Sequence, residues 1–243
     1  MIEIDRLTRR FGARTAVDGL TLRVAPGEVY GFLGANGAGK TTTMRMMLGI
    51  LASDAGTIRV CGRLVRRGDR DGRMLVGAVG EVQHFYPEMT CQAYLKFFAD
   101  LFDVPQPVQR VAEVLADVGL ADRARDRAVD LSKGLQQKLG LARALLHDPP
   151  VLLLDEPVSG LDPHGIREVR ELICRERDKG RLVFFSSHVL AEVAQVADRV
   201  GIMNRGRLVY ENTVAGALAG HGTLEAAFVA VTGGNVRQAE LVA

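Results

Sequence analysis

Cysteine, tryptophan and long apolar runs are scarce in this sequence, and each scarcity excludes a class of protein. The 243 residues contain no tryptophan and three isolated cysteines, Cys61, Cys91 and Cys174, without metal-binding or redox spacing. An odd number of scattered cysteines argues against a disulfide framework and favours small buried thiols in a reducing compartment. The longest apolar stretches, such as residues 151–154, are far below the roughly 18 residues that span a bilayer. We therefore expect any membrane role to require a separate partner that supplies the spanning helices.

The sequence also lacks an excess of charge of one sign. It has 31 basic and 29 acidic residues and a net charge of +2, so charge alone does not predict binding to nucleic acid or anionic lipid. Hydrophobic residues make up 47% of the chain, which is enough to bury a full core. We expect one globular unit with room for a modest insertion.

Short apolar runs alternate with amphipathic segments, which predicts an α/β fold with a mainly parallel sheet covered on both faces. An antiparallel β portion is expected at the N-terminus. Residues 204–207 are typical of a hairpin turn into a further antiparallel strand at 208–211. The other expected strands are residues 21–24, 29–33, 57–60, 74–79, 151–155, 182–186 and 199–203.

Strand patterns disappear between residues 90 and 147, where prolines separate stretches with helical patterning. We interpret this part as an all-helical insertion into the α/β core. The expected division is a core of residues 1–82 and 148–211, a helical unit of residues 83–147, and a C-terminal helical tail of residues 212–243.

Residues 34–41 read GANGAGKT and have the spacing of a phosphate-binding loop. Glycines let the backbone curve round a phosphate with its N–H groups pointing inward, and the following helix directs the positive end of its dipole at the same anion. A lysine and a hydroxyl at the end of the loop suit the outer phosphates and Mg²⁺. The candidate phosphate residues are Gly34, Asn36, Gly37, Ala38, Gly39, Lys40, Thr41 and Thr42.

Residues 151–157 read VLLLDEP, an apolar strand that ends in two carboxylates. In a parallel sheet, such a strand delivers its last side chains to the edge where ligands bind. Asp155 would hold Mg²⁺, and Glu156 would orient and deprotonate the water that attacks the γ-phosphate. Together with the loop, this strand predicts a nucleoside triphosphatase.

The segment LSKGLQQKLGLARALLHDPPVLLLDEPVSGLDP, residues 131–163, closely resembles the signature, Walker B and D-loop block of ABC transporter ATPases. The resemblance runs through nearly the whole chain. It implies that Ser132 and Gly134 belong to the signature and that residues 159–162 form the D-loop. It also implies that His188 contacts the γ-phosphate and that Phe11 stacks on adenine. Taken alone, Ser132 has an ordinary interpretation as a helix cap, His188 as a surface histidine and Phe11 as a core aromatic.

The resemblance further implies that Ser132 and Gly134 face the nucleotide of a second ABC ATPase chain, so that two chains enclose two ATP molecules. We expect a homodimer, although the sequence does not distinguish it from a heterodimer. Two positions depart from the family pattern. Glu81 stands where a glutamine usually meets Mg²⁺, with Gln83 as the alternative. Lys133 and Leu135 change the side chains within the signature.

Six of the thirteen aromatic residues lie between residues 85 and 102. Most follow a helical stripe and are expected to pack inside the helical unit. By resemblance, Phe85 and Tyr86 are candidates for docking a membrane subunit. An apolar face near the C-terminus is interpreted as a packing helix, and it resembles the tail of exporter ATPases; it is formed by Leu224, Ala227, Phe228 and Val231.

The resemblance thus predicts an ATP-hydrolysing subunit that powers export through a separate multi-span permease at the cytoplasmic face of the membrane, with ATP and Mg²⁺ as ligands. Thr41, Asp155 and Glu81 would hold the metal, and Glu156 and His188 would be catalytic. No nucleic acid is expected as a partner. The alternative is a soluble ABC-type clamp with a regulatory or nucleic-acid-associated role. A P-loop kinase or GTPase would lack the signature block.

Overall fold

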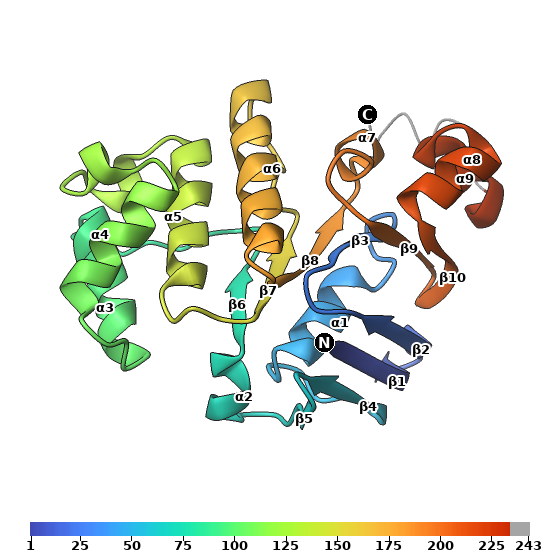
Figure 1. Cartoon of the computed structure of the whole chain (residues 1–243). Helices are drawn as coiled ribbons and strands as arrows, with labels where there is room; N and C mark the ends of the chain where they lie inside the picture. The colour runs from blue at the N-terminus through green and yellow to red at the C-terminus, as the bar shows by residue number, and fades with distance from the viewer. Residues whose placement is uncertain (234–243) are drawn as a thin grey trace.

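The computed structural model describes residues 1–233 and contains two sheets with helices packed around them (Figure 1). The larger, six-stranded sheet has the order β10-β9-β3-β8-β7-β6, in which β9, β3, β8, β7 and β6 run parallel and β10 is antiparallel to β9. The smaller, four-stranded sheet has the order β2-β1-β4-β5 and is antiparallel. The predicted fold class is confirmed.

The strands of the larger sheet lie close to the expected positions. They are β3 (Val29–Leu33), β6 (Val76–Val79), β7 (Val151–Asp155), β8 (Leu182–Ser187), β9 (Arg199–Asn204) and β10 (Arg207–Thr213). All residues of β3, β7 and β8 are buried, as expected for strands with helices or a second sheet on both faces. The strand expected at residues 74–79 begins only at Val76, because α2 (Arg70–Met74) precedes it with Asp69 as its N-cap.

The antiparallel sheet consists of β1 (Ile2–Phe11), β2 (Arg14–Val24), β4 (Ala55–Val60) and β5 (Arg63–Leu64). An antiparallel β portion was expected at the N-terminus, but the strand β1 was not among the strands predicted by residue range. Ile2 and Ile4 are buried in the alternation of a strand, but the register shifts between Ile4 and Leu7, which interrupts the period-two pattern.

Helices fill the chain between β6 and β7, as predicted. They are α3 (Cys91–Leu101), α4 (Pro107–Asp117), the short 3₁₀ helices η1 (Ala121–Arg123) and η2 (Ala128–Asp130), and α5 (Lys133–Leu145). In Figure 1 this unit stands beyond α6 (Pro163–Asp178), on the side of the molecule opposite the antiparallel sheet. The N-terminus of α3 is capped by Thr90, whose hydroxyl accepts a hydrogen bond from Ala93.

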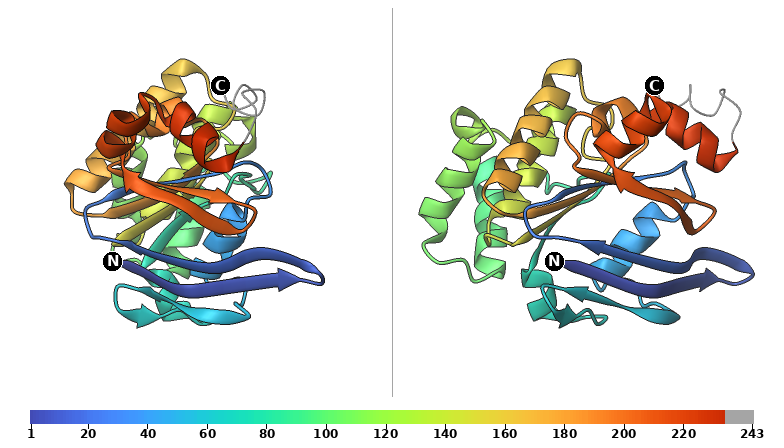
Figure 2. Two further views of the ribbon diagram at one scale, coloured as in Figure 1. Left: turned by 90° about the vertical axis from the view of Figure 1, so that its right-hand side faces the viewer. Right: turned by 45° about the vertical axis from the view of Figure 1, so that its right-hand side comes forward.

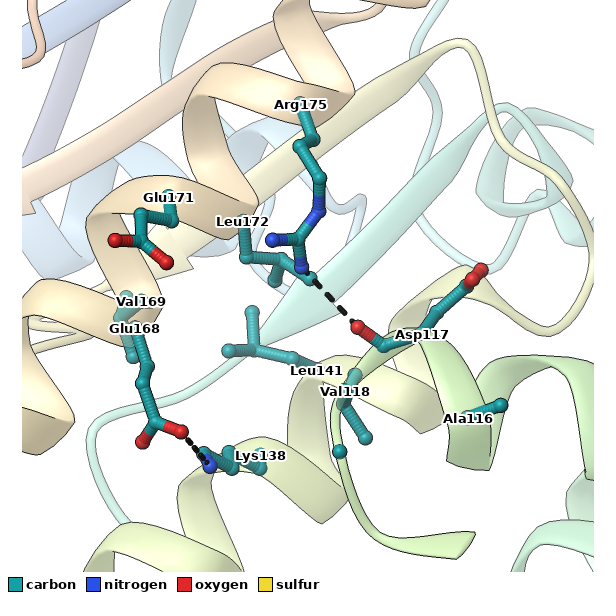
Figure 3. Close-up of a pocket in the computed structure, with 11 residues that line it drawn as sticks. Ala116, Asp117, Val118, Lys138, Leu141, Glu168, Val169, Glu171, Leu172 and Arg175 are labelled. Atoms are coloured by element: carbon teal, nitrogen blue, oxygen red, sulfur yellow. Dashed lines mark hydrogen bonds and ion pairs between the residues drawn. The ribbon is translucent and has the colours of Figure 1, made fainter.

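Two polar contacts bridge the helical unit and α6 across a cleft (Figure 3). The Lys138 ammonium on α5 lies 2.6 Å from Glu168 Oε1, and the Arg175 guanidinium donates to the carbonyl of Asp117 at 3.1 Å. Glu168 and Arg175, both on α6, thus hold the helical unit against the core.

The aromatic residues of the helical unit divide into packed and exposed groups. Tyr94 is fully buried, and Phe85 packs edge-on against it with ring centroids 5.1 Å apart. Tyr86 and Phe97 remain 51% and 42% exposed. Of the two residues expected to dock a membrane subunit, Tyr86 is therefore exposed and Phe85 is partly buried.

The C-terminal part forms α8 (Val214–His221) and α9 (Leu224–Thr232), which lie beside the β9–β10 hairpin (Figure 2). Leu224, Ala227 and Phe228 are buried, which confirms a packing helix. The expected tail of residues 212–243 extends beyond the described part, since residues 234–243 lie outside it. Within residues 1–233, no single helix is long and apolar enough to cross a membrane; only α8 and α9 taken together reach that length and hydropathy, with a 76° bend between them.

The cysteines are less uniform than expected. Cys91 is buried, Cys174 is partly buried and Cys61 is exposed. Cys61 lies in the tight turn between β4 and β5, with a positive φ of 50°, which places it at the surface.

Candidate functional site

The phosphate loop connects β3 to α1 (Lys40–Met47), the context that its sequence predicts. Gly39 precedes the helix with a φ of 113°, a backbone conformation that residues other than glycine rarely adopt. A Cβ at Gly34 would lie 2.6 Å from the carbonyl oxygen of Met203, so the loop lies directly against β9. Only glycine permits this conformation and this close approach.

Lys40 is buried at the start of α1, with 6% of its surface exposed. Its ammonium donates to the carbonyl of Gly34 at 2.5 Å and lies 3.5 Å from Glu156 Oε1. A buried ammonium is stabilised by such partners. The lysine is therefore already held over the loop by one carbonyl and one carboxylate.

The acidic pair lies where the end of β7 was expected to deliver it. Asp155 and Glu156 are 7% and 8% exposed. Glu156 has a φ of 51°, in the left-handed region that is uncommon for a residue with a side chain. Such backbone strain is frequent at functional positions, where surrounding contacts maintain it.

His188 follows β8 and contacts the carboxylate of Glu156. Its Nδ1 lies 2.7 Å from Glu156 Oε2, and its backbone N–H donates to the same oxygen at 3.3 Å. Lys40, Glu156 and His188 thus form one continuous chain of contacts across the ends of three neighbouring elements.

These residues line a cleft of about 310 Å³. Most sequence-predicted residues lie in its wall, and Phe11 stands at the edge, 48% exposed, with the Arg9 guanidinium 4.8 Å from its ring centroid. Three predicted residues, Gly34, Ala38 and Asp155, do not line the cleft. The lining residues are Phe11, Arg14, Ala16, Ala35, Asn36, Gly37, Gly39, Lys40, Thr41, Thr42, Glu81, Glu156 and His188.

The two candidates in the loop after β6 point in different directions. Glu81 lines the cleft. The Gln83 amide instead donates to the carbonyl of Gly80 at 2.6 Å, and its side chain packs against Gly140 of α5. The geometry favours Glu81 over Gln83 as the residue that faces a bound nucleotide.

Ser132 and Gly134, the residues predicted for the signature, do not line this cleft. Ser132 is the N-cap of α5 and accepts a hydrogen bond from the N–H of Leu135 at 3.4 Å. Gly134 lies next to Leu161, so the signature and the D-loop residues 159–162 are neighbours. Asp162 caps α6 by accepting from the N–H of Gly165 at 2.7 Å.

Two polar residues at the site, Arg14 and Ser186, were not predicted from the sequence. Arg14 lines the cleft and donates to the carbonyl of Gly37 at 3.0 Å, but it belongs to no motif. Ser186 is fully buried between Asp155 and Glu156. The sequence did offer a signal for Ser186, because a hydroxyl at the end of a buried strand requires a polar partner, and Ser186 stands near the end of the strand that leads to His188.

Comparison with known proteins identifies the family of this chain. The sequence pattern of the ABC transporter family matches residues 17–159. The chain belongs to the ABC transporter family. It is an ATP-binding subunit and an ATPase, which confirms the function predicted from the phosphate loop and the acidic strand, and excludes a P-loop kinase or GTPase.

Individual relatives of this ABC ATPase match most of the chain. The bacitracin transport ATP-binding protein BcrA of Bacillus licheniformis is 40% identical over 212 residues, which cover 87% of this chain and 69% of that protein. The Nod factor export ATP-binding protein I of Paraburkholderia xenovorans is 39% identical over 220 residues, covering 90% and 72%. A solved ATP-binding subunit of an ABC transporter superposes with a TM-score of 0.83 at 26% identity, covering 99% of this chain and 98% of that one.

Proposed function

We propose that this ABC ATPase powers the export of a substrate through a separate permease at the cytoplasmic face of the membrane, with two copies acting together. The contact chain from Lys40 through Glu156 to His188 is the observation that carries the hydrolytic part of this proposal. Export is supported by relatives named for bacitracin transport and Nod factor export.

The residues of the cleft suit a nucleotide bound with Mg²⁺. No group of three or more His, Cys, Asp or Glu side chains within residues 1–233 forms a metal site of its own. This agrees with Mg²⁺, which takes one or two protein ligands and completes its shell with phosphates and water. Thr41 and Asp155 would hold the ion, with Glu81 reaching it through water, and the bound metal would neutralise phosphate charge.

Hydrolysis requires a base beside the attacking water. Glu156 is placed for this role because its carboxylate is buried and is directed by His188 on one oxygen and Lys40 on the other. When phosphates enter the cleft, Lys40 gains new anionic partners and Glu156 is released to accept a proton from water. His188 then remains at the γ-phosphate end of the cleft.

A second copy would complete each site. Ser132 and Gly134 lie at the start of α5, where N–H groups and the helix dipole favour an anion, yet they do not line their own chain's cleft. We infer that they contact the nucleotide of the partner chain in trans. In a homodimer both sites would carry the full set of hydrolytic residues.

The permease would dock on an exposed apolar surface, the docking patch, which consists of Tyr86, Phe97 and Leu101. These side chains are 51%, 42% and 53% exposed; the rings of Tyr86 and Phe97 meet with centroids 6.0 Å apart, and Leu101 lies one helical turn after Phe97 on α3. Aromatic and aliphatic side chains of this kind are common anchors in protein interfaces.

The test is affinity purification of tagged Glu156→Gln protein from detergent-solubilised native membranes, with and without ATP, followed by mass spectrometry. A stoichiometric multi-span protein is expected, and its identity would lead to the cargo. Copurification of only soluble proteins or nucleic acid would refute the export proposal in favour of a regulatory clamp. A Phe11→Ala control at the nucleotide edge should weaken ATP-dependent capture without altering the docking patch.

A further inference from the structure

Ser186 lies on β8 beside the end of the acidic strand β7. In the parallel pairing of these strands, Asp155 is the register partner of Ser186. The Ser186 hydroxyl donates to Asp155 Oδ1 at 2.5 Å and accepts from the backbone N–H of Glu156 at 2.9 Å. One fully buried hydroxyl therefore joins the two carboxylate residues of the site.

The direction of these hydrogen bonds is fixed by chemistry. The Glu156 N–H can only donate, so it must meet a lone pair of the Ser186 oxygen. The single hydroxyl proton is then free for Asp155. A side chain without both functions cannot replace this bridge.

The bond to Glu156 holds the backbone that aims the proposed base. Glu156 has a φ of 51°, and its N–H is bound to Ser186 Oγ rather than to a neighbouring strand. The far end of the same side chain is held by His188. Glu156 is thus fixed from β8 at both ends, once through its backbone and once through its carboxylate.

The bond to Asp155 fixes one of its two carboxylate oxygens. Oδ1 accepts the Ser186 proton, while Oδ2 makes no hydrogen bond within the described part of the chain. The carboxylate is therefore oriented with one oxygen available to a metal ion or its water. Ser186 itself does not line the cleft.

We infer that Ser186 is a positioning residue for ATP hydrolysis, which acts by holding Asp155 and Glu156 in register with each other. This inference rests on the proposed roles of those two carboxylates. Because Ser186 does not touch the cleft, its loss should affect the chemical step more than the binding of ATP.

The first test compares three variants in steady-state ATP hydrolysis. Ser186→Ala should lower kcat by about 10- to 100-fold, the effect of a small misplacement of reacting groups, with KM for ATP changed by less than about threefold. Ser186→Thr keeps the hydroxyl and should recover most of the rate. Ser187→Ala is the matched control, because among residues 1–233 the Ser187 hydroxyl bonds only within its own turn, to Val189. Equal losses in Ser186→Ala and Ser187→Ala, or no recovery with threonine in a folded protein, would overturn the inference.

The second test is a double-mutant cycle with Glu156→Gln, measured by single-turnover hydrolysis. If Ser186 acts by aiming the base, Ser186→Ala should cost much less in the Glu156→Gln background than in the native chain. If Ser186→Ala lowers the rate of hydrolysis by the same factor in both backgrounds, Ser186 does not act by aiming Glu156. The cycle also separates the two proposals: near-native turnover of Glu156→Gln refutes Glu156 as the base, whereas an inactive Glu156→Gln with a fully active Ser186→Ala refutes only the role of Ser186.

Discussion

Replacing Glu156 with glutamine removes one negative charge from the buried contact chain without changing the size of the side chain. If Glu156 is the base, turnover should fall by about 10² to 10⁴-fold, which is the usual contribution of general base catalysis. Each factor of ten corresponds to about 1.4 kcal/mol, so the barrier should rise by about 3 to 5.5 kcal/mol.

The same substitution should destabilise the protein without nucleotide. Lys40 and Glu156 are both less than 9% exposed, and their charged atoms lie 3.5 Å apart. Breaking a buried pair by removing one partner costs about 3 to 5 kcal/mol. Lys40 keeps the carbonyl of Gly34, so we expect a smaller loss of about 2 kcal/mol in the free energy of unfolding.

ATP should reverse that loss, since its phosphates provide Lys40 with new anionic partners. A thermodynamic cycle then requires that Glu156→Gln bind ATP more tightly, by about 30-fold for 2 kcal/mol. Urea unfolding of the free chain, ATP titration and phosphate release measure the three quantities. Glu88→Gln is the control, because it makes the same chemical change at an exposed position. Near-native turnover would remove Glu156 from the role of base, and unchanged apo stability and affinity would contradict the contribution assigned to the Lys40 pair.

Three further predictions concern other parts of the chain. Burial lowers the pKa of His147 below its usual 6.5, so the folded chain resists protonation of this side chain while the unfolded chain does not. The free energy of unfolding should therefore fall as pH drops below about 6.5, and it should fall less steeply in the His147→Gln variant. Urea unfolding at pH 8 and pH 5.5 measures this difference. Burial alone would raise the pKa of Glu168, but the hydrogen bond and charge of Lys138 lower this pKa overall. Lys138→Met should therefore lower the free energy of unfolding by about 1 kcal/mol at pH 7, and its difference from the native chain should shrink as pH falls below 4.5. A difference that stays constant with pH would contradict the pairing. Tyr86→Ala should weaken copurification of the permease by about 30-fold while leaving the ATPase rate of the isolated chain unchanged, and unimpaired capture would remove Tyr86 from the docking patch.

The sequence by itself determined the features that depend on adjacent residues. The phosphate loop is set by glycines that permit a particular backbone path, so residues 34–41 could be recognised before any fold was known. The strand before Asp155 is apolar on both faces, and this continuous pattern was enough to locate β7 to the residue. The signature block likewise identified the family from one contiguous segment.

Only the tertiary structure decided which distant residues meet. Ser186 reaches Asp155 because β7 and β8 are in one register, and a strand shifted by one residue would turn that hydroxyl to the opposite face. The choice between Glu81 and Gln83 depended on Gly140, about 60 residues away, which leaves room for the glutamine side chain. The division of Phe85 from Tyr86 followed from packing against Tyr94. Each of these contacts joins residues that are not adjacent in the sequence, and local propensity carries no information about them.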